Sequence, residues 1–396
     1  SSLFGSSQPP GCAQRAAMAA EGAGCGGLRE VVVVGGGIVG CATAYFLSAK
    51  GIRVTVVERC GVACAASGKA GGFLARGWGS GPTEALHQQG FDLHAQLAAD
   101  LGIQSYRRLP TLSVDGGRRA RQAPSEFPWV DIAHSKLMDK ATAQVNPAEI
   151  TSKLFEAAAA KGASLTTGVA QGVRRDGDRV TAVVVDGTEL PCDAVVFAMG
   201  PWSVLVEQWL PEARVPMEGI LSTSLVFRLP APVEPPCALF CGEDEYGCHL
   251  EVNPRVDSTV YVCGCGGSAY LSSDQLAKLK PEEVVPDPKR VKAASESLRS
   301  KTSVTGSVDP EAGACIRPCP PDARPLLGRV VGNAFIACGH NCWGILWGPL
   351  TGLIMAELLV GGESPVPLAA FNPGRFAPRS AKRGRHLKEL PVGEQW

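Results

Sequence analysis

Runs of hydrophobic residues alternate with short polar or glycine-rich stretches along most of the chain. The first such run, VVVV at 31–34, holds no polar residue and is followed at once by GGGIVG. β-Branched residues favour strands, and an unbroken apolar run is typical of a strand that is buried on both faces. We therefore predict a parallel strand that ends at a tight turn. The pattern then predicts a helix over about 39–50 and a second strand over 52–57, which Glu58 closes.

Later segments repeat the arrangement of a short apolar strand that ends on glycine. Residues 162–203 predict several short strands, with a hairpin turn at Asp176–Gly177 and a buried strand, DAVVFAMG, that ends on Gly200. Near the C-terminus, AFIACG predicts another strand that ends on Gly339, and GILWGPLTGLIMAELLV predicts an apolar helix over 344–360. Each glycine is a place where the backbone can approach a ligand closely.

Composition excludes some classes of function. The 396 residues include 38 Lys+Arg and 38 Asp+Glu, so the formal net charge is zero, and this balance gives no indication of a nucleic-acid or anionic membrane partner. The apolar run over 31–47 is interrupted by glycines and is a poor membrane span, so we expect no transmembrane segment. We interpret AKRGRHLK (381–388) as part of a basic tail over 378–396.

The 15 cysteines do not suggest a disulfide framework, because the chain is large and several cysteines lie inside apolar runs. CGHNC (338–342) has metal-ligating residue types, but it falls in a glycine-rich strand-to-helix turn, so we predict no metal site. Residues 1–27 are rich in small residues and form a disordered or targeting lead-in. We expect a cytoplasmic protein, or one in a chloroplast or mitochondrion if this lead-in is a truncated transit peptide.

The first turn carries a dinucleotide-binding pattern. Gly35, Gly37 and Gly40 form G-x-G-x-x-G between a predicted strand and helix, and these glycines allow a tight turn, close approach to a pyrophosphate and close helix–strand packing. The helix N-terminus presents free N–H groups to phosphates. Glu58 follows at the end of the second strand, where an acid accepts hydrogen bonds from ribose hydroxyls. The alternative is a plain glycine-rich turn.

Two further segments favour FAD over NAD. AASGKAGGFL (65–74) is a loop of small residues in which Ser67 could lie near phosphate or ribitol and Ala70–Gly72 near a ring, whereas a nicotinamide enzyme is expected to continue strand–helix alternation. A flexible surface loop is the alternative. The N-terminus of the helix after Gly339 would point at the pyrimidine edge of a flavin, although an ordinary buried helix has the same pattern.

With these motifs the chain resembles the FAD-dependent amino-acid and amine oxidases of the D-amino-acid oxidase, glycine oxidase and sarcosine oxidase family, and ASGKAGGFLA is most similar to the glycine-oxidase-like branch. The matching segments also include DAVVFAMGPWS, IRPCPPDARPLLG and FIACGHNCWGILWGPLTG, and they span about residues 28–375. The resemblance implies an α/β fold, with a Rossmann-like FAD-binding domain of the glutathione-reductase type and a second α+β substrate domain built on an antiparallel sheet. The implied FAD-binding domain is discontinuous, over 28–85, 146–215 and 310–377, and the substrate domain takes 86–145 and 216–309.

The resemblance also implies a set of cofactor contacts along the FAD-binding segments. The residues expected to bind FAD are Gly35, Gly37, Ile38, Val39, Gly40, Glu58, Arg59, Ser67, Gly68, Ala70, Gly71, Gly72, Val169, Ala170, Gly200, Trp202, Gly339, His340, Asn341, Trp343, Gly344 and Ile345. Non-covalent binding is favoured. Covalent attachment through Cys315 is the alternative, because sarcosine-oxidase-like members attach flavin through a cysteine at a similar spacing.

The candidate catalytic residues are Arg317, Glu251, His249 and Lys69. The resemblance implies that Arg317, which precedes Pro318, binds a substrate carboxylate, for which a guanidinium is well shaped, whereas a structural salt bridge is the alternative. Glu251 or its neighbours on the same strand stand where glycine-oxidase-like members usually have a tyrosine, and a carboxylate there would favour a cationic amine. His249, on the predicted hairpin 247–267, is an alternative polar group, as are Tyr246, Tyr261 and Tyr270.

The implied activity is oxidation of the C–N bond of a small amino acid or amine by hydride transfer to flavin N5, with oxygen as electron acceptor. Lys69 could favour oxygen reduction through its charge, or could be a solvated loop residue. Two other functions fit the same pattern. One is a flavin dehydrogenase that passes electrons to a quinone or a protein, and the other is a non-catalytic assembly or trafficking factor stabilised by FAD.

Overall fold

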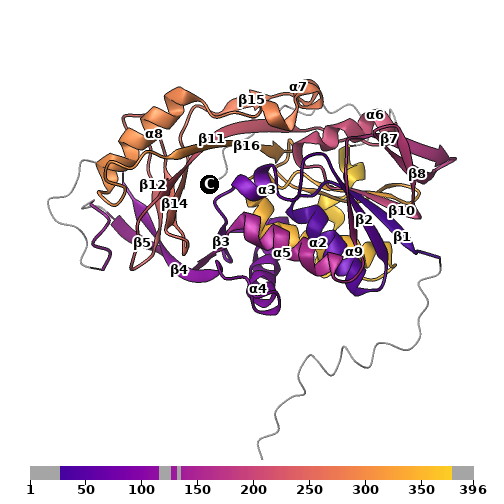
Figure 1. The fold of residues 1–396 in the computed structure, drawn as a ribbon, viewed down its shortest axis with the longest axis horizontal. Coiled ribbons are helices and arrows are strands. Elements are labelled where there is room, and N and C mark those ends of the chain that lie inside the picture. Colours follow the sequence, from indigo (N-terminus) through magenta and orange to yellow (C-terminus); the bar gives the residue numbers. More distant parts are fainter. Residues whose placement is uncertain (1–26, 116–125, 132–134, 377–396) are drawn as a thin grey trace, which may run out of the picture.

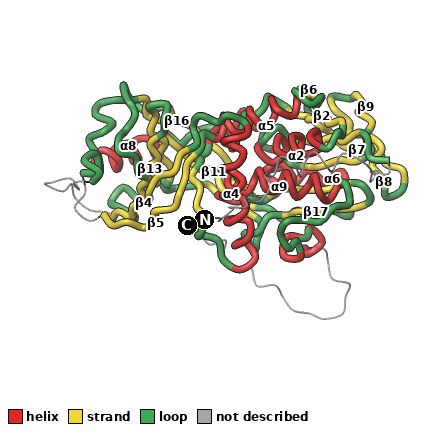
Figure 2. The backbone as a smooth tube through the Cα atoms, turned by 90° about the horizontal axis from the view of Figure 1, so that it is seen from below, coloured by secondary structure: helices red, strands yellow, loops and turns green. Residues whose placement is uncertain are grey.

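A computed structural model describes residues 27–115, 126–131 and 135–376 of the chain. The expected lead-in, apart from Gly27, and the expected basic tail lie outside these residues. Two sheets lie toward opposite ends of the long axis, with β4, β5 and β12 at one end and β1, β2 and β10 at the other (Figure 1). The view from below shows helices α2, α4, α5 and α9 beside the second group of strands (Figure 2).

The first sheet has six strands. From one edge to the other they are β17 (Leu326–Val331), β18 (Ala334–Cys338), β10 (Ala194–Phe197), β1 (Glu30–Val34), β2 (Arg53–Glu58) and β6 (Ser164–Thr167). All neighbouring strands are parallel except β17 and β18. Because parallel strands end at the same edge, the glycine turns after β1, β10 and β18 lie together.

Strand β1 is buried on both faces, as the unbroken valine run predicts. Val31 and Val33 pack in a core cluster with α2 (Ile38–Ala49), α4 (Glu84–Asp100), α5 (Pro147–Ala159) and α9 (Gly344–Leu359). Val32 and Val34 face the opposite core cluster, which includes a three-stranded sheet. The strands of that sheet are β7 (Ala170–Asp176), β8 (Arg179–Val185) and β9 (Thr188–Pro191). A polar residue on either side of β1 would be buried without solvent.

Helices α2 and α9 pack directly against each other through glycines of α9. A Cβ atom placed on Gly352 would lie 2.4 Å from the Cβ of Ala42, and one on Gly348 would lie 2.6 Å from Ile38. The two backbones therefore approach closely, and this contact fixes the relative position of the two helix N-termini.

Within the described residues, one helix is long and apolar enough to cross a membrane by length and composition. It spans Asn341–Leu359, and 61% of its most apolar window is buried inside the structure. Its partners are α2 and α4, and core helices of this kind pass the same test. The burial favours a core helix for this segment.

The second sheet is larger and mostly antiparallel. Its strands follow the order β15 (Ala269–Leu271), β11 (Glu218–Arg228), β14 (Thr259–Cys263), β13 (Glu251–Pro254), β12 (Ala238–Cys241), β4 (Arg107–Val114), β5 (Ser135–Gln144) and β3 (Phe73–Ala75), and β16 (Glu311–Cys319) also pairs with β11. Helix α8 (Pro288–Lys301) packs on one face through Ala294 and Leu298. Shorter helices are α3 (Ala66–Lys69), α6 (Val206–Trp209) and α7 (Ser273–Lys278).

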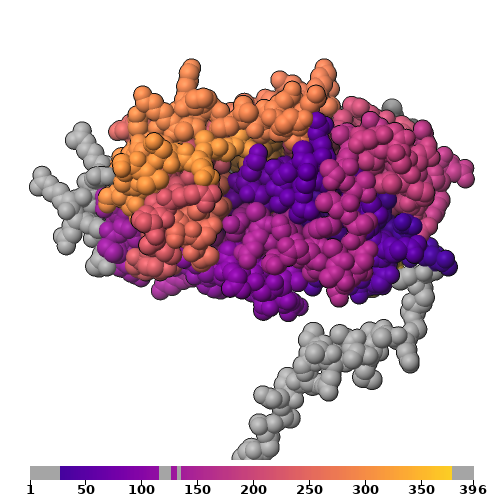
Figure 3. Space-filling view, viewed as in Figure 1, coloured from indigo at the N-terminus to yellow at the C-terminus, as the bar shows by residue number. Residues whose placement is uncertain are grey.

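The observed α/β architecture with a second, largely antiparallel sheet agrees with the expected fold class. Two strands and one helix lie in a different part of the fold from the one expected for their segments. β3 and β16, which fall in the segments expected to form the FAD-binding part, are strands of the larger sheet, because they pair with β5 and β11. α4, expected in the substrate part, packs on α9. In the space-filling view, indigo residues from early in the chain adjoin orange residues from its last third (Figure 3).

Candidate active site

A cavity of about 390 Å³ lies where the two sheets meet. One part of its wall comes from the turns that follow β1, β2, β10 and β18. The other part comes from one face of the larger sheet, on β11, β13, β14 and β16. The cavity therefore extends from the end of β2 to the strands of the larger sheet.

The glycine turn after β1 forms one end of the cavity. Gly35 has a φ of +114°, and a Cβ atom there would lie 2.4 Å from the carbonyl oxygen of Ala198. Helix α2 then begins at Ile38, with no side-chain cap at Gly37 and no acidic residue in its first turn. The Ile38 N–H donates to Ser67 Oγ at 3.0 Å. A helix N-terminus without an acidic cap attracts anions such as phosphate.

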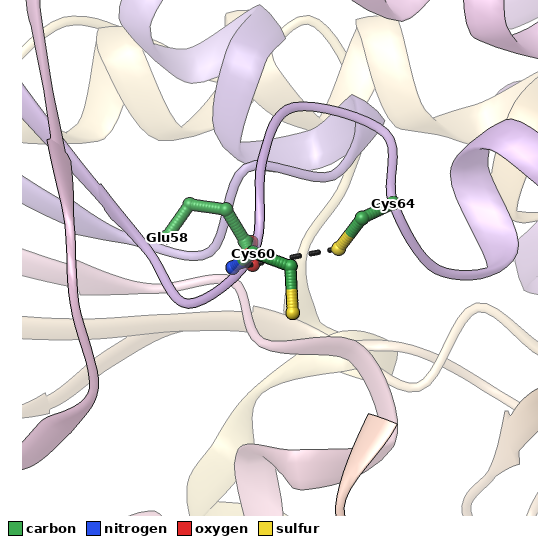
Figure 4. A group of neighbouring side chains, drawn as sticks. All are labelled: Glu58, Cys60 and Cys64. Atoms are coloured by element: carbon green, nitrogen blue, oxygen red, sulfur yellow. Dashed lines mark hydrogen bonds between the residues drawn. The ribbon is translucent and has the colours of Figure 1, made fainter. Parts of the chain in front are cut away.

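Glu58 ends β2 beside this turn, and backbone N–H groups hold its carboxylate. Oε2 accepts from the Gly36 N–H at 2.7 Å and Oε1 accepts from the Cys60 N–H at 3.0 Å. The Cys64 thiol points at the same carboxylate (Figure 4). Among the described residues, Glu58, Cys60 and Cys64 have potential metal-ligand atoms within 4.8 Å of one another. Burial first, and then Glu58, raise the pKa of Cys64 to about 12, which disfavours the thiolate that a metal needs.

Replacing Glu58 tests the role of this end of the cavity. We expect Glu58→Ala to weaken FAD binding by about 10- to 100-fold, because the change removes the acceptor that orders the Gly36 N–H and that can accept from ribose hydroxyls. Titration of the FAD-free protein with FAD, followed by flavin fluorescence, measures the affinity. Glu189→Ala is the matched control, since Glu189 is an exposed acid on β9 that pairs with Arg174. Equal affinities for the two variants would contradict the assignment.

The small-residue segment after β2 includes the short helix α3 and then lies against the larger sheet. Arg255 donates to the Ala70 carbonyl oxygen at 2.9 Å, and its guanidinium lies over the Tyr261 ring at 4.9 Å. A Cβ atom on Gly71 would lie 2.9 Å from the same ring. Lys69 lines the cavity at the end of α3. This segment is therefore held against the larger sheet and is not a free surface loop.

The N-terminus of α9 opens on the cavity from the other side. Trp343, Gly344 and Ile345 line it, and the helix has no side-chain cap and no acidic residue in its first turn. His340 is buried and its Nε2 lies 3.0 Å from Thr351 Oγ1. Burial lowers the pKa of His340 to about 4, so this ring is neutral near pH 7. Two helix N-termini, those of α2 and α9, thus face one cavity.

Alternate residues of the larger sheet form the opposite wall. Glu251 and Asn253 on β13 face Cys263 and Tyr261 on β14, as Cα partners in the antiparallel register. Side chains two residues apart on a strand share a face, so His249 joins Glu251 and Asn253. Asn253 is fully buried, and neither polar atom of its side chain has a hydrogen-bond partner in the protein. Burial raises the pKa of Tyr261, which stays a neutral phenol.

Glu251 and Arg317 are the charged pair on this wall. Burial raises the pKa of the Glu251 carboxyl above its ordinary value of 4.5, although the Cys263 thiol, Arg317 and His249 act in the opposite direction. The Cys263 thiol donates to Glu251 Oε2 at 3.5 Å. Arg317, on β16, has a buried Nε without a hydrogen-bond partner in the protein. Arg317 therefore has a donor available to a ligand, and the Glu251 carboxyl lines the same cavity.

The raised pKa of Glu251 predicts a pH-dependent loss of stability. Between 4.5 and the higher pKa of the folded state, the folded protein keeps a proton that the unfolded chain has lost. The stability that this proton contributes is thus fully present below pH 4.5, and it is lost as the pH rises through the pKa of Glu251 in the folded state. Glu251→Gln removes this effect, so we expect its stability relative to wild type to increase with pH, by about 1.4 kcal/mol for each pKa unit of difference.

Urea unfolding of both proteins between about pH 4.5 and 8, at one fixed FAD concentration, measures this difference. Glu245→Gln is the control because Glu245 is an exposed acid outside the cavity lining. A stability difference that does not change with pH would contradict the prediction.

The structure places most of the expected site residues around the cavity. These are Arg317, Lys69, Glu251, His249, Gly35, Gly37, Ile38, Val39, Glu58, Arg59, Ser67, Ala70, Gly71, Gly72, Val169, Ala170, Gly200, Trp202, His340, Asn341, Trp343, Gly344 and Ile345. Cys315 also lines it, and its covalent attachment to flavin stays a prediction. Tyr261 lines the cavity, whereas Tyr246 and Tyr270 do not.

Three glycines expected to bind the cofactor do not line the cavity. A Cβ atom on Gly40 would lie 1.9 Å from the Gly35 carbonyl oxygen, and one on Gly68 would lie 2.1 Å from the Ala63 carbonyl oxygen. A Cβ atom on Gly339 would lie 2.5 Å from Pro320. These glycines are needed for close packing behind the wall. Sequence patterns did not identify Asn253, Phe73 or Phe240 as site residues. Asn253 alternates with Glu251 on β13, and that alternation is a usable signal.

The cavity residues fit FAD at both of its ends. The N-terminus of α2 and the Glu58 carboxylate suit a pyrophosphate and a ribose, respectively. The N-terminus of α9 and the unpaired Asn253 amide suit the polar edge of a flavin ring. Gly37 keeps the turn open, since a Cβ atom there would lie 3.0 Å from Ser67 Oγ.

Comparisons with known proteins agree with this assignment. Residues 30–358 match the family model described as "DAO: FAD dependent oxidoreductase". A putative oxidoreductase of Schizosaccharomyces pombe, C1F5.03c, is 25% identical over 373 residues, which cover 84% of this chain and 94% of the relative. The MnmC bifunctional protein of tRNA 5-methylaminomethyl-2-thiouridine biosynthesis from Pseudomonas aeruginosa is 26% identical over 91% of this chain, but the match spans 61% of that relative.

Among solved structures, the glycine oxidase of Geobacillus kaustophilus superposes with a TM-score of 0.74. It shares 20% sequence identity, and the alignment covers 88% of this chain and 100% of that one. At this level of identity the likeness establishes the fold, including the pairing of a Rossmann-like sheet with a larger antiparallel one.

Proposed function

The chain belongs to the DAO family of FAD-dependent oxidoreductases, and from this premise we propose that it oxidises the C–N bond of an amino acid or amine. Bound FAD supplies the hydride acceptor for such a reaction. The observation that carries the proposal is the presence of Arg317 and Glu251 in one cavity with the cofactor-binding turns. These two side chains offer one partner for a carboxylate and one for an amine.

Arg317 binds the substrate carboxylate in this proposal. Its guanidinium offers two parallel N–H donors, a geometry that matches the two oxygens of a carboxylate. The buried and unpartnered Nε supports a role in ligand binding, because a structural salt bridge would leave fewer donors free. None of the carboxylates in the described residues forms an ion pair with Arg317 within 4.0 Å.

Glu251 receives the substrate nitrogen. A carboxylate in a buried site attracts an ammonium group, and its raised pKa brings it closer to the pH at which it can accept a proton from that group. Loss of the ammonium proton to Glu251 Oε leaves a neutral amine, whose lone pair assists departure of the hydride from the adjacent carbon. Tyr261 and Asn253 lie buried on the same wall.

We propose oxygen as the electron acceptor, with Lys69 as the nearby positive charge. Positive charge favours the reduction of oxygen, because negative charge develops on it. A dehydrogenase that uses a quinone or a protein acceptor would have the same wall of Arg317 and Glu251. The two functions differ in whether hydrogen peroxide forms under air.

A visible spectrum of the purified protein, followed by anaerobic addition of amino acids and amines, tests the proposal. We expect flavin absorbance that is lost on addition of one class of compound, and stoichiometric peroxide when air is admitted. Loss of absorbance without peroxide would indicate a dehydrogenase. A flavin whose absorbance is changed by none of the compounds would contradict the proposed activity and favour a non-catalytic role.

A further inference from the structure

Four aromatic side chains gather at one end of the cavity. Phe73, Trp78 and Phe240 form a mutually packed trio with ring centroids 4.9–5.2 Å apart, and Trp343 lies 6.3 Å from Trp78. We call these four residues the aromatic wall. Phe73, Phe240 and Trp343 line the cavity. Trp78 stands behind them, where its indole N–H donates to Asp139 at 2.9 Å.

The aromatic wall is not part of the hydrophobic core in the ordinary sense. The three core clusters of the described residues include none of Phe73, Trp78 and Phe240. All three are only partly buried, although large aromatic side chains gain most from complete burial. Phe73 and Phe240 line the cavity, so the structure leaves an apolar surface for a ligand to cover.

The aromatic wall has a defined place relative to the charged pair. Phe240 on β12 and Glu251 on β13 are Cα partners, so their side chains lie next to each other on the same face of the sheet. Arg317 lies on β16, which pairs with β11 and is the third strand beyond β13. The order along the wall is therefore an apolar surface, an acid and then a guanidinium, and the charges of Glu251 and Arg317 affect each other.

We propose that the substrate is an α-amino acid with a large apolar side chain, which packs on the aromatic wall. This inference rests on the proposed function, in which Arg317 binds the carboxylate and Glu251 receives the amino group. A substrate as small as glycine would fill the two charged positions and leave Phe73 and Phe240 uncovered. A ring or branched chain on the α-carbon would cover them, and aromatic side chains make favourable offset or edge contacts with such groups.

Binding of two carboxylates that cannot be oxidised tests the inference independently of turnover. Phenylacetate and acetate both offer a carboxylate for Arg317, but only phenylacetate has a ring for the aromatic wall. We expect phenylacetate to bind the FAD-loaded protein about 10- to 100-fold more tightly than acetate, measured by calorimetry and by the change in the flavin spectrum. Phe240→Ala reduces this ratio toward one, and Phe240→Leu, which keeps an apolar side chain of intermediate size, retains part of it.

A control variant and a measure of folding show whether the change in the affinity ratio comes from the aromatic wall. Tyr270→Ala removes an aromatic ring from β15 of the same sheet, outside the cavity lining, and leaves the ratio unchanged. The FAD content of each variant shows that the protein is folded. Equal affinity for the two carboxylates, no binding of either, or a ratio that Phe240→Ala does not change overturns the inference.

A parallel measurement separates this inference from the proposed function. Glycine, alanine and both enantiomers of phenylalanine are added anaerobically to the same protein, and we expect phenylalanine to remove flavin absorbance fastest. Reduction by glycine with no preference for phenylacetate would overturn the substrate class and leave the proposed function standing. Preferential binding of phenylacetate, with no reduction by any amino acid or amine, would overturn the proposed function and leave the ligand class standing.

Discussion

Arg317→Met is expected to lower kcat/KM for an amino acid substrate by about 100- to 1,000-fold. The change removes the buried guanidinium that offers two donors to the substrate carboxylate, and loss of a buried charged partner costs about 3–4 kcal/mol. FAD binding stays intact because the cofactor turns lie on the other sheet. Steady-state kinetics and the flavin content of the purified variant measure the two effects.

Two further variants make this result interpretable. Arg317→Lys keeps the positive charge but loses the fork of donors, so we expect an intermediate loss. Arg228→Met is the matched control, since Arg228 lies on β11 of the same sheet and forms an exposed ion pair with Glu311. A kcat/KM for Arg317→Met equal to that of Arg228→Met would refute the carboxylate assignment. Catalysis of a carboxylate-free amine should change little in Arg317→Met.

Gly35→Ala is expected to abolish FAD binding and to lower the unfolding free energy by about 2–4 kcal/mol. The φ of Gly35 is +114°, which L-residues other than glycine rarely adopt, and the added Cβ would lie 2.4 Å from the Ala198 carbonyl oxygen. That oxygen belongs to backbone, so relief requires β1 and the end of β10 to separate. Urea unfolding and flavin content measure the two losses.

Gly61→Ala is the matched control for Gly35→Ala. Gly61 lies in the loop after β2, without a positive φ, and a Cβ atom there has no heavy atom within 4 Å. We expect it to keep both FAD and stability. If Gly35→Ala retains flavin at the level of Gly61→Ala, the turn after β1 is not the site that holds the cofactor.

Local sequence signals predicted much of the nucleotide half of the molecule. The valine run, the glycine turn and Glu58 belong to one stretch of about 30 residues, so strand, turn, helix and strand follow from neighbouring residues alone. The hairpin over 247–267 was also predictable, and its turn contains Ser258, which has a positive φ of 64°. Each of these features depends on short-range sequence patterns.

The substrate half was harder to predict because its wall is assembled from distant segments. β3 has three residues and offers too short a pattern to be recognised, yet it brings Phe73 beside Phe240, 167 positions later in the chain. Glu251 was recognised only by comparison with a tyrosine in the resembling family. Tyr261 was one of three candidate tyrosines, and the pairing of β13 with β14 places it opposite Asn253 on the cavity wall. These residues are brought together by the pairing of strands that are distant in the sequence, and this pairing cannot be recognised from a single sequence.

The cavity is lined from both sheets, so a ligand that fills it contacts both halves of the chain. A ligand that binds only the folded state raises stability by mass action, by about 2.7 kcal/mol at a concentration 100-fold above its dissociation constant. For this family member that ligand is a vitamin-derived cofactor, and proteases remove unfolded chains preferentially. The cellular amount of the protein is therefore expected to follow the supply of riboflavin, with scarcity lowering its abundance before its transcript changes.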